Sequence, residues 1–194
     1  MATKNGKAPF VSEDDFELTM ESIKGKNQRR NRVVIMFSHF LGLRAKELAS
    51  LKVGDVIDKN GKIKETIRLL AAYTKGGTYR EVFLVDPKAR ECLRFYLLCE
   101  RAASCPEAPL FLSQKGGEFS ANTMQRMIGN IYKKAGIKAS SHSGRRTFAT
   151  RLIRSNVDIY SIKQLMGHSS IQTTQEYFAS DPNLLKAAVY KLSN

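Results

Sequence analysis

Helical periodicity dominates the hydrophobic pattern of this chain. Between turn signals, apolar side chains recur three or four positions apart, which is the repeat of one helix face. Near the start, Ser12 is a candidate N-cap, acidic residues follow it, and Phe16, Met20 and Ile23 line one face. The same reasoning predicts helices at residues 12–23, 29–41, 43–48, 86–103, 120–135, 143–155, 158–166, 170–177 and 181–192.

Residues 53–85 have a different pattern, with short β-prone runs between polar turns. Asn60-Gly61 is a strong hairpin signal, and a second turn at residues 75–77 separates residues 67–74 from 79–85. We therefore expect a three-stranded antiparallel meander here. The chain as a whole is predicted to be an α+β fold, mainly helical, with one small three-stranded antiparallel sheet.

A length of 194 residues suits one domain with short appendages. Residues 1–9 are polar and basic, which is typical of a loose tail. Residues 10–180 carry the periodic segments and are predicted to form the domain. Residues 181–194 hold a C-terminal helix whose apolar face can fold back on its own chain or dock on a neighbouring protomer.

The charge balance points to a polyanionic partner. The chain has 32 Lys and Arg against 18 Asp and Glu, a formal net charge of +14, and such an excess favours nucleic acid or an acidic membrane surface. A membrane surface is the weaker alternative because no basic amphipathic helix with bulky apolar residues stands out. A basic protein with scattered lysines is the plain alternative.

The sequence shows no signal for a membrane span, for export or for a cysteine metal site. No apolar run is long enough to span a membrane and no signal-peptide core precedes the first helix, so we expect a cytoplasmic protein. The three cysteines make an odd count without metal-ligand spacing. Cys92 and Cys99 lie in an apolar helical pattern and are predicted to be buried thiols.

Basic residues cluster at the start of the helix predicted at residues 29–41. Cations at a helix N-terminus oppose the macrodipole, so Arg29, Arg30 and Arg32 suit contact with a DNA backbone better than a structural role. A solvated basic turn is the alternative.

The chemistry that the chain can perform is suggested by a set of residues with matching roles. Attack on a phosphodiester builds charge on the non-bridging oxygens, which arginine forks and imidazoles can bind, and it needs a nucleophile and an acid for the leaving oxygen. No carboxylate cluster for a metal is evident, and none is required. The candidates are Arg44 and Arg145 as clamps, His142 and His168 as donors or proton carriers, Lys75 as the acid for the 5′-oxygen, and Tyr177 as the nucleophile.

Each candidate also has a plain structural explanation. His142 can start a helix, His168 can follow a helix end, and Tyr177 can be a packing residue. Arg145 and Arg146 are adjacent, so one of them is expected to face solvent. Individually none of these residues indicates a function; the joint pattern does.

That joint pattern resembles the catalytic domain of the tyrosine recombinases, the phage-integrase family. The resemblance runs from about residue 10 to the end of the chain. It is carried by Arg44 in GLRAKELASL, Lys75 in TKGGTYREVFL, His142 and Arg145 in HSGRRTFAT, His168 in LMGHSSIQTT, and Tyr177 in TQEY.

The resemblance implies that Tyr177 attacks the scissile phosphate and forms a 3′-phosphotyrosine link, without ATP, metal or other cofactor. It implies that Glu47 supports the site from behind, that Arg146 and the basic cluster contact double-stranded DNA, and that residues 181–192 are exchanged between four identical protomers. Accessory DNA-bending proteins are candidate partners. The expected location is the nucleoid of a bacterial or phage-infected cell.

Two features depart from the family pattern. Most members carry an N-terminal helical domain that clamps the DNA, whereas 43 residues precede Arg44 here, so an excised domain and a short recombinase are both open. Gly144 stands where the family more often has Leu, which affects local packing. A non-cleaving DNA-binding module of the same fold and a 3′-phosphotyrosine topoisomerase are the alternatives to a site-specific recombinase.

Overall fold

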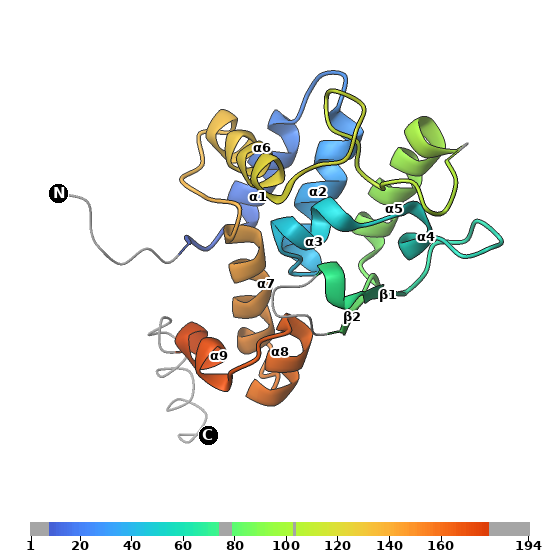
Figure 1. Ribbon diagram of the computed structural model, residues 1–194. Coiled ribbons are helices and arrows are strands. Elements are labelled where there is room, and N and C mark those ends of the chain that lie inside the picture. Colours follow the sequence, from blue (N-terminus) through green and yellow to red (C-terminus); the bar gives the residue numbers. More distant parts are fainter. Residues whose placement is uncertain (1–7, 74–78, 103, 179–194) are drawn as a thin grey trace, which may run out of the picture.

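Helices make up most of the fold, and one small sheet lies beside them (Figure 1). The computed structural model describes residues 8–73, 79–102 and 104–178. The elements in chain order are α1 (Glu13–Ser22), α2 (Gln28–Phe40), α3 (Ala45–Ser50), α4 (Val53–Val56), β1 (Thr66–Leu69), the 3-10 turn η1 (Ala71–Tyr73), β2 (Arg80–Phe83), α5 (Pro87–Tyr96), the π-helical segment η2 (Leu97–Arg101), α6 (Ala121–Lys134), α7 (Ser143–Arg154), α8 (Ile159–Met166) and α9 (Ile171–Phe178). The mainly helical α+β class is confirmed.

Local capping signals explain where several helices begin. Ser12 Oγ accepts a hydrogen bond from the Asp15 amide at 3.1 Å, and Ser120 Oγ accepts one from the Thr123 amide at 3.2 Å. Asp158 caps α8 in the same way. A side-chain oxygen at this position satisfies an amide that the first helical turn leaves without a partner, so these starts are set by residues within one turn.

The predicted third strand is wrong. Among the described residues the sheet has two antiparallel strands, β1 and β2, which pair Thr66 with Phe83 and Leu69 with Arg80. Residues 53–56 form the short helix α4 instead of a strand. Asp55 Oδ2 accepts the Lys52 amide at 2.8 Å and closes a capping box there, and this local bond favours a helical turn over extended backbone.

The expectation that Cys99 is buried is also wrong. Cys92 is partly buried on α5, but Cys99 lies in η2 and is exposed. A π-helical turn takes more residues than an α-helical turn, so it rotates the later side chains away from the face that the earlier pattern predicts.

The interior consists of two apolar clusters that α7 joins. The larger one surrounds α2, which is buried from Val33 to His39. The smaller one lies between α7, α8 and α9 and contains Ile153, Ile162 and Met166, with Tyr177 packed against it. Figure 1 shows α7 running from the side of α1 and α6 down to α8 and α9. α8 and α9 therefore pack on the rest of the fold mainly through α7 and β2.

Gly144 permits the close approach of α7 to α2. A Cβ at this position would overlap Ser38 Oγ and lie 3.0 Å from the Ser38 carbonyl carbon. A leucine, expected at this place from the family resemblance, would overlap Ser38. The glycine therefore complements α2 of this chain.

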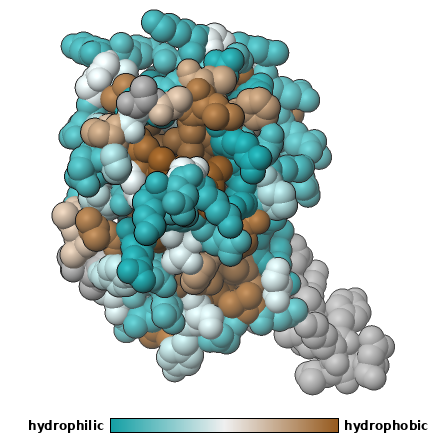
Figure 2. Space-filling model, turned by 90° about the vertical axis from the view of Figure 1, so that its right-hand side faces the viewer, coloured by the Kyte–Doolittle hydropathy of each residue, from teal (hydrophilic) through white to brown (hydrophobic). Residues whose placement is uncertain are grey.

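Most of the visible surface is hydrophilic. Figure 2 shows the face that lies on the right in Figure 1, where hydrophilic side chains surround hydrophobic ones gathered in a hollow. None of the helices in the described part of the chain is long and apolar enough to cross a membrane.

Candidate active site

A buried carboxylate organises two arginines at the centre of the site. The Glu47 side chain is 0% exposed, and that of Arg80 is 4% exposed. Glu47 Oε2 accepts a hydrogen bond from Arg80 Nη2 at 2.6 Å, and Oε1 accepts one from Arg44 Nη1 at 2.9 Å. The Arg44 amide donates to Oε2 at 2.7 Å, so Glu47 also caps the start of α3. One carboxylate thereby fixes Arg44 by both its backbone and its guanidinium.

The carboxyl end of α8 is held by three arginines, one for each of three consecutive carbonyls. Arg80 Nη1 donates to the Leu165 carbonyl, Arg145 Nη2 to the Met166 carbonyl, and Arg44 Nη2 to the Gly167 carbonyl at 3.2 Å. The last carbonyls of a helix lack intrahelical partners and carry the negative end of the macrodipole. Cations are therefore stabilised here, and the helix end is tied to α3, β2 and α7.

Two glycines in left-handed conformation allow this arrangement. Gly42 has φ +64° and its carbonyl accepts Arg145 Nη1 at 2.6 Å, while Gly167 has φ +59° and ends α8. A Cβ on Gly42 would overlap the Phe148 ring, and one on Gly167 would overlap Arg80 Cδ. Only glycine suits both the backbone conformation and the space.

The cluster formed by Arg44, Arg80, Arg145 and Glu47 carries excess positive charge. Three guanidiniums against one carboxylate leave a net charge of +2 among the described residues of the cluster. Burial, together with the neighbouring Arg44 and Arg80, lowers the pKa of Arg145 to about 9. Burial alone would raise the pKa of Glu47, but Arg80, Arg145 and the Arg44 amide hold it below its usual value. An anion would relieve the repulsion between the arginines.

His168 follows directly after the arginine-bound helix end and faces Tyr177. Its Nδ1 lies 2.9 Å from Thr174 Oγ1, and its ring stacks on that of Tyr177 with centroids 5.9 Å apart and an interplanar angle of 11°. Burial and the nearby Arg145, Arg44 and Arg80 lower the pKa of His168 to about 3. The imidazole is therefore neutral near pH 7 and has one donor and one acceptor nitrogen.

His142 lies near Arg145 and Arg44. It is the N-cap residue of α7, and its Nδ1 is 3.3 Å from Ser141 Oγ. Burial, Arg145 and Arg44 lower its pKa, so this side chain belongs to the same electrostatic environment as His168. Five of the predicted site residues thus come together, namely Arg44, His142, Arg145, His168 and Tyr177, with Glu47 behind them.

Two of the predicted features lie outside the described residues. Lys75, the expected general acid, belongs to residues 74–78, and the C-terminal helix expected at 181–192 belongs to residues 179–194. Their roles stay predictions.

The three arginines at the start of α2 lie in different environments. Arg29 is exposed and lies 3.9 Å from Glu100, and Arg32 is partly buried. Arg30 is buried, donates to the Leu112 carbonyl at 2.5 Å and lies 5.1 Å from the centre of the Phe119 ring. Its guanidinium is therefore held by contacts within the protein.

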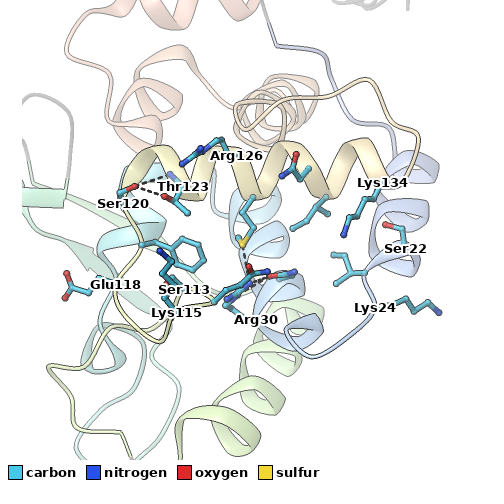
Figure 3. A pocket seen from close by; sticks show the side chains of 17 residues that line it. Ser22, Lys24, Arg30, Ser113, Lys115, Glu118, Ser120, Thr123, Arg126 and Lys134 are labelled. Atoms are coloured by element: carbon cyan, nitrogen blue, oxygen red, sulfur yellow. Dashed lines mark hydrogen bonds between the residues drawn. The ribbon is translucent and has the colours of Figure 1, made fainter.

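Arg30 also lines a groove of about 820 Å³ between α2, α6 and residues 113–120 (Figure 3). Lys24, Lys115, Arg126 and Lys134 line the same groove, against one acidic residue, Glu118. Arg146, on α7, is partly buried. The sequence singled out the basic start of α2 but missed this groove, because its cations come from separate segments.

Arg80 is a residue of this cluster that the sequence pattern did not single out. A signal was present, since Arg80 alternates with the apolar Val82 and Leu84 and so belongs to the inward face of β2. An arginine at an inward position needs a buried partner. That partner, Glu47, lies 33 positions earlier, and nothing local pairs the two.

The comparisons with known proteins agree with the fold. The chain belongs to the phage integrase family, whose family model matches residues 9–183. Among curated proteins it is 31% identical over 180 residues to tyrosine recombinase XerA of Pyrococcus furiosus, covering 92% of this chain and 60% of the relative. It is 26% identical over 194 residues to tyrosine recombinase XerH of Campylobacter jejuni, covering 96% of this chain and 52% of the relative.

Solved structures show the same similarity. The crystal structure of XerA recombinase matches with a TM-score of 0.78 and 28% identity, covering 96% of this chain and 65% of that one. A post-cleavage complex of XerH with a palindromic difH substrate matches with a TM-score of 0.75 and 25% identity, covering 100% and 56%. The chain spans little more than half the length of these curated relatives.

Proposed function

We propose that this chain is the catalytic domain of a site-specific DNA recombinase that cuts and rejoins strands through a covalent bond to Tyr177. The observation that carries the proposal is the convergence of Arg44, Arg145 and His168 with Tyr177 at the carboxyl end of α8. The family membership and the cleavage complex of XerH support it.

Binding of the scissile phosphate is the first step. The net positive cluster attracts the phosphodiester, and the Arg44 side chain, which is 22% exposed, offers its guanidinium to the incoming oxygens. Arg145 contributes its positive charge, since its Nη1 and Nη2 already bind the Gly42 and Met166 carbonyls, and His142 is a further donor. These groups stabilise the additional charge that develops on the non-bridging oxygens during attack.

Tyr177 then attacks phosphorus. The new bond joins the Tyr177 phenolic oxygen to phosphorus while the bond from phosphorus to the 5′-oxygen breaks, which leaves a 3′-phosphotyrosine and a free 5′-hydroxyl. Lys75 gives its proton to the leaving 5′-oxygen, and the phenolic proton passes to a neutral acceptor. A 5′-hydroxyl from the partner duplex reverses the step, so the bond energy is kept and no ATP, metal or other cofactor enters.

The tautomer of His168 decides its part in this step. With Nδ1 accepting from the Thr174 hydroxyl, Nε2 carries the proton and donates to a phosphate oxygen. With Nδ1 donating, Nε2 is free to accept the phenolic proton. Both follow from a neutral ring.

The remaining parts of the proposal concern assembly and place. Four identical protomers act on two double-stranded DNA segments, with residues 181–194 exchanged between neighbours and DNA-bending proteins as accessory partners. Arg29, Arg32 and Arg146 contact the DNA backbone, in the cytoplasm. Phosphate contacts of this kind make the affinity fall steeply with salt.

The test is a suicide duplex that carries a nick near the cut, so that cleavage releases a short fragment and traps the protein. Wild type is expected to form a covalent adduct on a denaturing gel, and Tyr177→Phe is expected to form none. Tyr160→Phe, which changes an exposed tyrosine of α8, is the matched control and should form the adduct. Salt-sensitive binding without an adduct would support a non-cleaving DNA-binding module, and sustained relaxation of supercoiled plasmid without recombination would support a topoisomerase.

A further inference from the structure

Every guanidinium nitrogen of Arg80 is committed to the protein. Nε and Nη2 both bind the Glu47 carboxylate, at 3.3 and 2.6 Å, and Nη1 binds the Leu165 carbonyl. With a side chain only 4% exposed, it has no free face for a phosphate. Its role must lie in what it holds.

The two partners of Arg80 lead to two different phosphate-binding groups. Glu47 fixes Arg44 through both the guanidinium and the backbone amide. Leu165 lies three residues before His168, at the end of a helix that makes its own cap at Gly167. Arg80 thus joins the carboxylate behind Arg44 to the helix that carries His168, in addition to the link that Arg44 itself makes between Glu47 and Gly167.

We propose that Arg80 is a positioning residue that sets Arg44 and His168 at the spacing which the reacting phosphate requires. The planar fork suits this task, because a single guanidinium can bind a carboxylate with two nitrogens and a carbonyl with the third. The inference rests on the proposed function, but the arrangement that it describes exists without DNA.

A positioning residue should affect the chemical step more than DNA binding. Arg80→Met is expected to lower the single-turnover cleavage rate by about 100-fold, because a displacement of catalytic groups by about 1 Å has that effect. The dissociation constant for the suicide duplex should stay within about threefold, since Arg80 is not presented to DNA. Arg80→Lys keeps the charge but not the fork, and should recover part of the rate, to about 10-fold below wild type.

A matched control separates positioning from stability. Arg90 also binds backbone carbonyls, those of Leu84 at 2.9 Å and Ile63 at 3.3 Å, but it contacts neither Glu47 nor α8. Arg90→Met is expected to lower the melting temperature and to leave the cleavage rate at the wild-type value. If Arg80→Met does not fold, Arg80→Lys carries the comparison. A folded Arg80 variant that cleaves at the wild-type rate, or that loses only affinity, would overturn the proposal.

A second measurement needs neither DNA nor activity. The chain has three histidines, so protein labelled with ¹⁵N-histidine gives one set of ring signals each for His39, His142 and His168. Arg80→Lys should shift the signals of His168 and leave those of the distant His39 in place. Unchanged His168 signals would overturn the positioning role. A wild-type chain that forms no DNA adduct, but whose His168 signals respond to Arg80, would refute the recombinase function alone.

Discussion

Glu47→Gln removes the one carboxylate that lies between the buried arginines of the cluster. The substitution keeps the shape of the side chain but removes the charge, and it replaces one acceptor oxygen by an amide group that faces a guanidinium donor. Four hydrogen bonds to the carboxylate are affected, from Arg80 Nη2 at 2.6 Å and Nε at 3.3 Å and from Arg44 Nη1 at 2.9 Å and its amide at 2.7 Å, around a side chain that is 0% exposed.

The expected loss is about 3–5 kcal/mol in the free energy of unfolding at pH 7, because breaking a buried pair leaves an uncompensated buried charge. For a domain of this size that corresponds to roughly 2–4 °C of melting temperature per kcal/mol, or about 6–20 °C in all. Arg44 loses its anchor at the same time, so cleavage of the suicide duplex should fall as well.

The loss should depend on pH in a defined direction. The pKa of Glu47 in the folded protein lies below its ordinary value of 4.5, so the charged form contributes stability that is present above that value. This stability disappears as the pH falls through the folded-state pKa. The difference between wild type and Glu47→Gln should therefore be largest at pH 7 and smaller at acidic pH.

Urea denaturation followed by circular dichroism, at pH 7 and about pH 3, measures both quantities. Glu81→Gln is the matched control, since Glu81 makes an exposed pair with Arg68 at 3.3 Å and its loss should cost less than about 1 kcal/mol. A Glu47 variant as stable as the Glu81 variant at pH 7, or a difference that does not shrink in acid, would refute the reasoning.

Three further predictions concern packing and titration. Gly144→Ala should lower the free energy of unfolding by about 1–3 kcal/mol, because its Cβ overlaps Ser38. Ser38→Gly in the same chain should restore part of the loss. A melting temperature equal to that of wild type would contradict this. Gly167→Ala should lower the free energy of unfolding by at least about 1–2 kcal/mol through the positive φ alone, and should also slow cleavage by displacing Arg80. A wild-type melting temperature together with a wild-type cleavage rate would count against this prediction. Burial, with a smaller effect of Arg151, lowers the pKa of His39 from 6.5 to about 3. Below pH 6.5 the unfolded chain therefore takes up a proton that the folded chain excludes. The free energy of unfolding should fall by up to about 1.4 kcal/mol per pH unit. His39→Phe should reduce that slope between pH 7 and 5 and leave the contribution of His168, whose pKa is lowered to about 3 in the same way; an unchanged slope in urea denaturation would contradict the role of His39.

Most helix positions were predictable because their signals are local. The caps at Ser12, Ser120 and Asp158 act within one turn, and the apolar repeat of each helix is visible in the sequence. Residues 53–56 were misassigned for a related reason. The prediction followed their β-prone side chains, whereas in the structure the hydrogen bond from the Lys52 amide to Asp55 favours a helical turn.

The site was predictable in its members and unpredictable in its connections. The sequence pattern named Arg44, His142, Arg145, His168 and Tyr177, since each stands in a recognisable motif. It did not reveal that Arg30, one of three neighbouring arginines, turns inward to the Leu112 carbonyl, 82 positions away. Burial of a long side chain depends on which segment covers it.

The sequence by itself thus determined the helices, the positive charge and the residues suited to phosphate chemistry. Tertiary structure decided that α8 ends against three arginines, that Glu47 joins Arg44 to Arg80, and that His168 faces Tyr177. The physical reason is one of range. Capping and periodicity act over a few residues, whereas the Arg80 contacts join residues 33 and 85 positions apart, which only the packing of α3, β2 and α8 brings together.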